Sequence, residues 1–343
     1  MTLSGGGWYS SFCVMKKYER STTIKTTDKP LLTRIPGITY YNPPMEYVLE
    51  GRDGKVAIPL KGIPVPLEDD YYATLGDSIP TYDAIGKGVY TALRNNPDCE
   101  YNEFYAGLLK EGYPHLVSEL ATYIVMLDKK DVDVPYLDRK INYLKIVGLM
   151  EPDNYRVPLE IGMAYLDKGL QLSALQFATV SLFRAEKYLT RAVELQPDDL
   201  KAVYNLGEVS YILGKYDNAT RLWKGLLDTE LSPEQSSTLQ RRLQKIADGN
   251  LSPVPAVDYL EVIATAFALY QQGEVEETAA LLLDVIDDHL FCDEFPIAEL
   301  WYVLGLCYKQ MAMPKYSEQY LREALKINPQ CLEAEQALET VYS

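Results

Sequence analysis

The stretch that decides the fold is residues 298–331, AELWYVLGLCYKQMAMPKYSEQYLREALKINPQC. Its apolar side chains recur at alternating intervals of three and four residues in two successive runs, which is the spacing of two amphipathic helices. Met313 and Pro314 separate the runs, and proline disfavours helix in the residue before it. We therefore expect a helical hairpin. Its two apolar stripes are Trp301, Leu304, Leu306 and Tyr308, then Tyr320, Leu321, Ala324 and Leu325.

The same hairpin fits a known 34-residue pattern, W-x2-L-G-x2-Y, followed by a small residue, a large apolar residue, Ala and Pro. On these grounds residues 298–331 resemble the tetratricopeptide repeat (TPR). One such unit cannot bury its own apolar face, so the resemblance implies an all-α solenoid of stacked helical hairpins. The matching positions are Trp301, Leu304, Gly305, Tyr308, Ser317, Leu321, Ala324 and Pro329.

Further helical units are expected on both sides of this one. Residues 201–228 repeat the pattern with Leu206, Gly207, Gly214, Ala219 and Trp223. The Gly- and Pro-containing residues 248–255 form the best internal boundary, which divides the array into a first block, 66–248, and a second block, 255–343, closed by a helix over 332–342. The other expected helices cover residues 67–75 and 80–95, paired as a hairpin, then 101–111, 114–127, 135–150, 233–247, 257–272 and 274–288; the pairing of 101–150 is open.

One unit is irregular in length. Residues 152–197 span a repeat plus eleven residues, and eleven residues make about three helical turns. Residues 172–194 contain neither Gly nor Pro. We therefore expect one long helix over residues 171–195 that projects from the array as a ridge, with an irregular loop as the alternative.

The amino-terminal part differs from the rest of the chain. Residues 1–14 are expected to be a disordered extension, and Met15 is an alternative start to Met1. Residues 15–65 form a Pro-rich segment with one β-hairpin, in which residues 46–50 and 55–60 alternate around the turn 51–54. A lone hairpin is barely stable in water. We expect residues 30–65 to pack as a cap on the first helices, or, as a sharper variant, to cover the ligand groove as a lid.

Composition excludes several classes of protein. The net charge of −16 disfavours nucleic acid and anionic membranes as main partners. No apolar run approaches the roughly 18 residues that cross a bilayer, and the amino terminus lacks the features of a secretory signal. Five scattered cysteines and two histidines suggest neither a disulfide framework nor a metal site. A reducing, cytoplasmic location fits best.

Catalytic motifs are missing as well. Residues 86–88 lack the remainder of a phosphate-binding loop, and Asp131 and Asp133 begin a calcium loop that Pro135 interrupts. No Ser-His or Cys-His pair can be recognised. We expect no enzyme activity, no cofactor and no metal.

What the chain has in abundance is tyrosine, 28 residues against 7 phenylalanines. Tyrosine suits half-buried recognition surfaces because it joins an apolar ring to a polar tip. In TPR proteins the inner face of the first helix of each unit lines a concave, peptide-binding groove. The resemblance places eight residues there: Lys201, Tyr204, Glu208 and Tyr211 in one unit, and Glu299, Tyr302, Leu306 and Lys309 in another.

The resemblance also bears on the partner. Some TPR proteins bind the acidic carboxy terminus of a chaperone through a clamp of Lys, Arg and Asn. Here the corresponding positions hold residues such as Leu159, Met163, Glu299 and Val303. A neutral or basic protein segment is therefore favoured over an acidic tail.

The expected function is a non-catalytic scaffold that binds a protein segment in its groove. The alternative is a regulatory or substrate-recruiting subunit of an enzyme complex, which would need a polar cluster in residues 1–65. A third reading is a self-assembling array, recognisable by concentration-dependent oligomers. The sequence leaves the partner, the pathway and the oligomeric state open.

Overall fold

The structure is a computed structural model that describes residues 32–51, 57–127 and 134–342. The segment expected as a disordered extension lies outside these residues. The described helices are α1 (Asp69–Leu75), α2 (Tyr82–Asn95), α3 (Asn102–Gly112), α4 (Pro114–Leu127), α5 (Val134–Met150), α6 (Arg156–Leu170), α7 (Ala178–Leu195), α8 (Leu200–Ile212), α9 (Tyr216–Lys224), α10 (Pro233–Asp248), α11 (Ala256–Gln272), α12 (Val275–Ile286), α13 (His289–Glu294), α14 (Ala298–Gln310), α15 (Pro314–Ile327) and α16 (Leu332–Glu339). A 3₁₀ helix, η1, covers Leu172–Phe177, and the strands are β1 (Ile38–Tyr41), β2 (Val48–Glu50), β3 (Ala57–Pro59) and β4 (Val65–Glu68).

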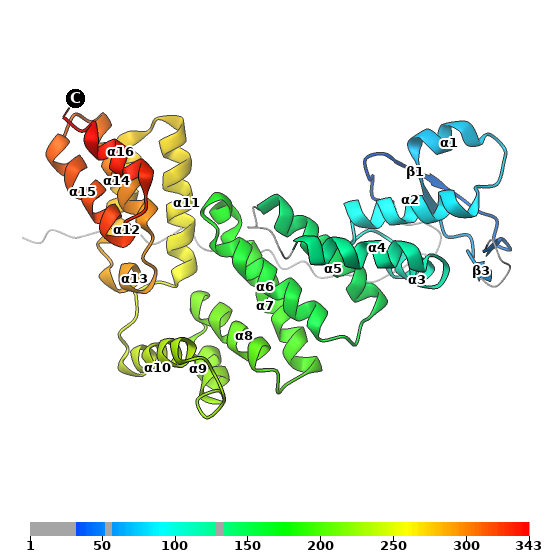
Figure 1. Cartoon of the computed structure of the whole chain (residues 1–343), viewed down its shortest axis with the longest axis horizontal. Coiled ribbons are helices and arrows are strands. Elements are labelled where there is room, and N and C mark those ends of the chain that lie inside the picture. The colour runs from blue at the N-terminus through cyan, green and yellow to red at the C-terminus, as the bar shows by residue number, and fades with distance from the viewer. Residues whose placement is uncertain (1–31, 52–56, 128–133, 343) are drawn as a thin grey trace, which may run out of the picture.

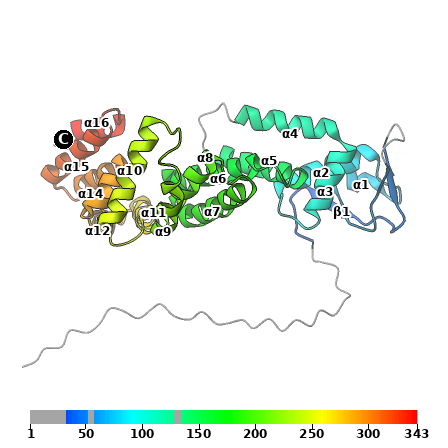
Figure 2. The same cartoon turned by 90° about the horizontal axis from the view of Figure 1, so that it is seen from below.

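The helices form an elongated array, with the strands at its amino-terminal end (Figure 1; Figure 2). Four pairs of consecutive helices pack as hairpins, α6 with α7, α8 with α9, α11 with α12 and α14 with α15. Contacts of α7 with α8 and of α12 with α14 join one hairpin to the next, and α5 packs on the first of them through α6. The all-α solenoid that the sequence predicts is confirmed.

The hairpin of α14 and α15 has the expected close crossing. A Cβ atom on Gly305 would lie 2.7 Å from Cγ of Leu321, so only glycine allows the two helices to approach this closely. The Ser317 hydroxyl donates to the carbonyl of Gly305 at 2.8 Å, which satisfies a polar group in the buried interface.

The expected β-hairpin is confirmed in its strands. β2 and β3 pair antiparallel with Leu49 opposite Ile58, while the turn at 52–56 lies outside the described residues. A second pairing was not predicted: β1 and β4 also run antiparallel, with Thr39 opposite Leu67. The segments on either side of the hairpin therefore form a second pair of strands.

These strands pack against α2 and α3, as the cap prediction expects. Leu49, Leu60 and Val65 are buried in one cluster with apolar residues of both helices. The Tyr105 hydroxyl donates to the carbonyl of Pro64 at 2.6 Å. A Cβ atom on Gly88 would lie 2.1 Å from the carbonyl oxygen of Pro66, so β4 lies directly on α2.

The expected hairpin of helices 67–75 and 80–95 is wrong. Leu67 and Glu68 belong to β4, and α1 packs mainly on β1 and β4. The cause is burial of Leu67 between β1 and α2, which favours the paired, extended backbone over a helix start at this residue.

The open pairing of residues 101–150 is resolved by the position of α4. α5 packs on α2, α3 and α6, whereas α4 lies to one side of the array (Figure 2). α4 buries one side chain fully, Leu120, and leaves Val125 and Met126 each 55% exposed.

The expected long helix over 171–195 is also wrong. Gln171 has an extended backbone (φ −72°, ψ 127°) that ends α6, η1 follows, and α7 begins only at Ala178. Ala174 and Leu175 of η1 are each 1% exposed. The extra residues therefore turn inward, because a buried apolar contact is available to them.

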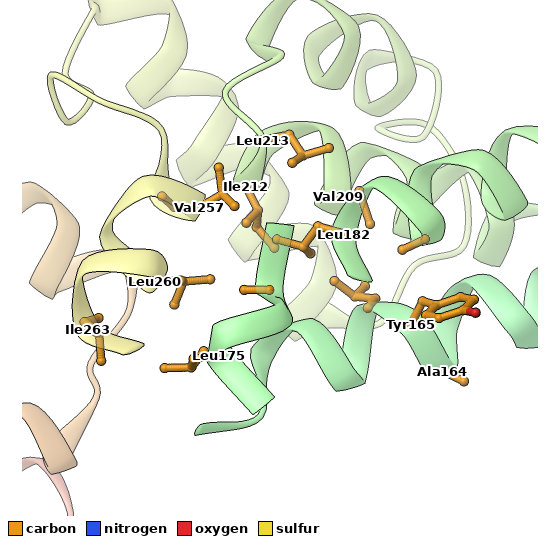
Figure 3. Close-up of a cluster of buried hydrophobic side chains, with 14 of the residues drawn as sticks. Ala164, Tyr165, Leu175, Leu182, Val209, Ile212, Leu213, Val257, Leu260 and Ile263 are labelled. Carbon is orange, nitrogen blue, oxygen red and sulfur yellow. The ribbon is translucent and has the colours of Figure 1, made fainter. Parts of the chain in front are cut away.

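That contact is the joint with α11. Leu175 lies near Leu260 and Ile263 of α11, and Ile212 and Leu213 at the end of α8 approach its first turn (Figure 3). One apolar cluster thus runs from α5 to α14, across the boundary expected at 248–255. Helices on both sides of this boundary share a core.

Candidate functional site

The first set of predicted groove residues lies on α8. Lys201 is exposed, and its Nζ atom lies 3.3 Å from the Glu160 carboxylate on α6. Tyr204 is half-buried, and its backbone carbonyl accepts a hydrogen bond from the Trp223 indole at 3.2 Å. These two residues keep part of their side chains at the surface.

Glu208 and Tyr211 differ from the prediction, because α10 covers them. The Arg242 guanidinium donates to Glu208 at 2.5 Å and stacks over the Tyr211 ring at 4.7 Å. Tyr211 is 5% exposed and packs against Trp223. Neither residue is placed to line an open groove, since a neighbouring helix of the same chain occupies that position.

Glu294 of α13 also binds α10 through ion pairs. Its side chain is 4% exposed and accepts hydrogen bonds from Arg241, Arg242 and Lys245 at 2.5 to 3.0 Å. Burial alone raises the pKa of this carboxyl, but the three cations outweigh burial and lower the pKa to about 2. The cluster is therefore an ionised structural link between α8, α10 and α13, in which Glu208 Oε2 is buried without a hydrogen-bond partner.

The second predicted set lies on α14, in a different part of the array from α8 (Figure 1; Figure 2). Glu299, Tyr302, Leu306 and Lys309 are all half-buried. Tyr302 packs in the apolar cluster shared with α16, and Lys309 donates to the Thr340 hydroxyl at 2.6 Å. The structure thus keeps the two sets on separate helices.

A cavity of about 560 Å³ opens elsewhere, between α2 and the first half of α4. This volume is within the range of ligand sites, roughly 300 to 1,000 Å³. The lining residues are Glu68, Asp83, Lys87, Tyr90, Thr91, Arg94, Tyr113, His115, Leu116 and Glu119.

Arg94 has an unusual environment at one end of this cavity. Its guanidinium carbon lies 5.1 Å from the ring centre of Tyr90 and 5.3 Å from those of Tyr123 and Tyr143. Its Nη2 atom donates to the Tyr143 hydroxyl at 2.8 Å. Burial acts to lower the pKa of Arg94, but this hydrogen bond and the tyrosines raise it overall, so the side chain is a fixed cation.

The remaining charges of the cavity are largely arranged in local contacts. Lys87 pairs with Glu68 at 2.7 Å, and Thr91 donates to the same carboxylate at 3.1 Å. The Tyr90 hydroxyl lies 3.4 Å from Glu119, and burial raises the pKa of this tyrosine.

A second cavity, of about 300 Å³, lies between α5, α6 and α7. Its buried cation, Lys145, already pairs with Asp98 at 2.5 Å. The cavity between α2 and α4 is therefore the better candidate, because its arginine stands against aromatic rings instead of a carboxylate.

Sequence reasoning found the abundance of tyrosine but not this cavity. Tyr90 and Arg94 are four residues apart on one helix, which is a readable signal of contact. Tyr123 and Tyr143 join them only because α4 and α5 fold back beside α2. That arrangement depends on the pairing which the sequence left open.

Two structural absences hold for residues 32–51, 57–127 and 134–342. No group of three or more His, Cys, Asp or Glu side chains there is arranged to hold a metal ion. None of the helices in this part of the chain combines the length and apolar character needed to cross a membrane.

Comparison with known proteins identifies one TPR unit in the array. The sequence profile of the family described as "Tetratricopeptide repeat" matches residues 298–331, the hairpin of α14 and α15. The match covers this one hairpin and identifies it as a tetratricopeptide repeat unit. A search of curated proteins finds no match.

Similar solved structures include a crystal structure of MamA protein, which is 18% identical. The alignment covers 62% of this chain and 94% of the MamA chain, with a TM-score of 0.25. A TPR protein from Parabacteroides merdae is 12% identical, with coverages of 76% and 92% and a TM-score of 0.25. YrrB, described as a TPR protein with an unusual peptide-binding site, is 15% identical, with coverages of 74% and 99% and a TM-score of 0.21. Similarity at this level transfers neither a ligand nor the placement of the helices to this chain.

Proposed function

We propose that the protein is a non-catalytic scaffold that binds a segment of a partner protein. The observation that carries the proposal is the cavity of about 560 Å³ between α2 and α4. It combines tyrosine rings with a fixed arginine, and interface energy concentrates in residues of these two types. The TPR unit at α14 and α15 is consistent with a protein-interaction role.

The predicted groove remains part of the proposal in reduced form. Lys201 and Tyr204 on α8, and the four predicted residues of α14, keep some exposed surface. Glu208 and Tyr211 are left out, because α10 covers them. A segment bound in the cavity and a second contact on one of these faces are compatible.

The partner segment is proposed to be neutral or basic overall. The chain carries a net charge of −16, which repels acidic partners at long range. For the same reason nucleic acid is not the proposed partner. A cytoplasmic location is proposed, since the described cysteines are free thiols, and burial raises the pKa of both Cys99 and Cys307 to about 11.

Site-specific crosslinking tests where the partner binds. A photoreactive phenylalanine analogue replaces exposed His115 at the cavity in one sample and exposed Gln240 of α10 in a matched control. We expect one partner segment to crosslink at position 115 and not at position 240 in the native host. Equal yields at both positions would contradict a binding site at the cavity.

The crosslinked segment, made as a peptide, allows a quantitative test on the full chain. Leu116→Trp partly fills the cavity, and we expect it to weaken binding about tenfold or more, whereas Gln240→Trp leaves it unchanged. Replacing Tyr204 and Tyr302 by Ala adds a loss of about 1 to 3 kcal/mol if the groove faces also contribute. Calorimetric titration measures affinity, and circular dichroism checks that helical content is retained.

A further inference from the structure

The tyrosine cluster around Arg94 fixes the direction of its side chain. Three rings surround the guanidinium, and the Tyr143 hydroxyl accepts from one of its nitrogens. The arginine chain itself is half-buried. A long side chain held in this way has already lost most of its conformational freedom, so a ligand that binds it has little ordering cost to overcome.

Most of the N–H donors of this guanidinium make no hydrogen bond to the described residues. An arginine side chain carries five N–H donors in a planar fork that matches a carboxylate. Among the described residues, one hydrogen bond is made by the fork, to the neutral hydroxyl of Tyr143. Arg94 therefore differs from Arg242, which lies over two aromatic rings but pairs with two carboxylates.

The other charged groups near Arg94 do not fill this role. Glu68 accepts from Lys87 and Thr91, and Glu119 lies beside the Tyr90 hydroxyl. Arg94 is partly desolvated and has no carboxylate partner within the described part of the chain. A ligand that supplies a carboxylate stabilises such a cation, because charge-assisted bidentate hydrogen bonds are the strong ones.

We propose that Arg94 recognises the carboxylate of an acidic side chain, Asp or Glu, in the partner segment. This inference rests on the proposed function and names the chemistry of one anchor. The carboxylate pairs with the fork of Arg94, and the Tyr90 ring excludes water on one side. The rest of the segment is neutral or basic, since the net charge of −16 opposes a run of acids.

The site is separate from the predicted groove positions. Arg94 lies near the end of α2, outside the TPR unit at residues 298–331 and outside the positions at which the clamp was sought. Its recognition of a carboxylate depends on α4 and α5, which supply Tyr123 and Tyr143.

Nuclear magnetic resonance of arginine Nε–H groups in the full chain tests the proposal directly. The probes are the acetylated and amidated peptides GSXSG, with Glu, Gln or Lys at X, and a fourth, GSQSG with a free carboxy terminus. Arg191 on α7, a surface arginine paired with Glu194, is the internal control. We expect the Glu peptide to shift the Arg94 signal at a concentration about tenfold lower than that of Arg191.

The Gln and Lys peptides should leave the Arg94 signal unchanged. Arg94→Lys keeps the charge but loses the fork, and we expect it to weaken the Glu peptide about tenfold, whereas Arg191→Lys has no effect. An Arg94 response no stronger than that of Arg191, or an equal response to the Gln peptide, overturns the proposal. A response to the free carboxy terminus alone overturns the assignment to an acidic side chain.

The two proposals can fail separately. If crosslinking at position 115 finds a segment whose affinity is unaffected by Arg94→Lys, the scaffold function stands and the role of Arg94 falls. If the Glu peptide binds Arg94 but no segment crosslinks at the cavity, Arg94 is a carboxylate-binding residue and the proposed scaffold function at this cavity falls.

Discussion

The α8–α9 and α14–α15 hairpins use the same close crossing but fill it differently. A Cβ atom on Gly207 would lie 2.2 Å from the Trp223 indole nitrogen, and one on Gly305 would lie 2.7 Å from Cγ of Leu321. Both glycines are thus required by a large side chain of the second helix. The pattern demands a large apolar residue at that position, and either an indole or a leucine satisfies it.

The helices that follow the two hairpins differ more. α10 combines ion pairs, in which Arg242 joins Glu208 to buried Glu294, with an apolar contact of buried Leu239 on the cluster around Trp223. α16 is held mainly by apolar contacts, with its Ala334, and Val341 just after the helix, buried in one cluster with Leu321. The repeat therefore dictates the hairpin, while the contact with the next helix can include buried ion pairs, as at α10, or be mainly apolar, as at α16.

The largest expected effect comes from emptying the two crossings. Trp223→Ala should destabilise the α8–α9 hairpin by about 3 to 5 kcal/mol, and Leu321→Ala should destabilise α14–α15 by about 2 to 5 kcal/mol. Trp223 should cost more because it also donates to the Tyr204 carbonyl and supports Arg242.

Native-state hydrogen exchange separates the two regions, because stability in an array is approximately a sum of local terms. Each variant should lower protection most in its own hairpin. Equal loss of protection in both hairpins would show that the array unfolds as one unit and would break the comparison.

The second effect concerns the ionic link. Glu294→Gln leaves Arg241, Arg242 and Lys245 without their shared carboxylate, and we expect a loss of about 3 to 5 kcal/mol, typical of breaking a buried pair. Glu323→Gln removes a surface pair with Lys326 and should change stability by less than about 0.5 kcal/mol. Urea unfolding compares the two variants with the parent chain.

The link also predicts a pH dependence. The pKa of Glu294 is lowered to about 2 in the folded chain, against about 4.3 when unfolded. A lowered folded pKa means that this stabilisation, about 3 kcal/mol, is complete above pH 4.3 or so and is lost as pH falls toward 2. The difference in stability between the parent chain and Glu294→Gln should shrink in that window, and a constant difference would contradict it.

Local patterns were enough to predict most of the helices from the sequence. The hairpins of α8–α9, α11–α12 and α14–α15 follow from apolar spacing and from Gly and Pro at their turns. The predictions for residues 67–75 and 171–195 were wrong for the same reason, because a buried contact with a distant segment overrode the local helical pattern. Leu67 pairs with β1, and Leu175 packs against α11. A helical period does not contain the information about which distant surface becomes available.

Even less of the candidate site could be predicted from the sequence. The groove residues were placed by their positions within a repeat. Glu208 and Tyr211 are covered because α10, which follows the α8–α9 hairpin, places Arg242 against both of them. The cavity at Arg94 depends on how α4 and α5 pack, and no short-range pattern specifies this.

The smallest expected effect concerns how α10 and α16 begin. Ser232 caps α10, and its hydroxyl accepts from the Gln235 backbone at 3.2 Å while the Gln235 side chain accepts from the Ser232 backbone at 3.2 Å. α16 begins after Cys331, which makes no such cap. Ser232→Ala should therefore lower stability by about 1 kcal/mol, since capping residues contribute roughly 0.5 to 2 kcal/mol.

Cys331→Ser should have the opposite effect on stability, a gain of up to about 1 kcal/mol. Serine would place a hydroxyl acceptor at the first turn of α16, where the preceding backbone is already extended. Hydrogen exchange of the first-turn amides of α10 and α16 measures both, and a gain in α16 with no loss in α10 would contradict a stabilising role of the Ser232 cap.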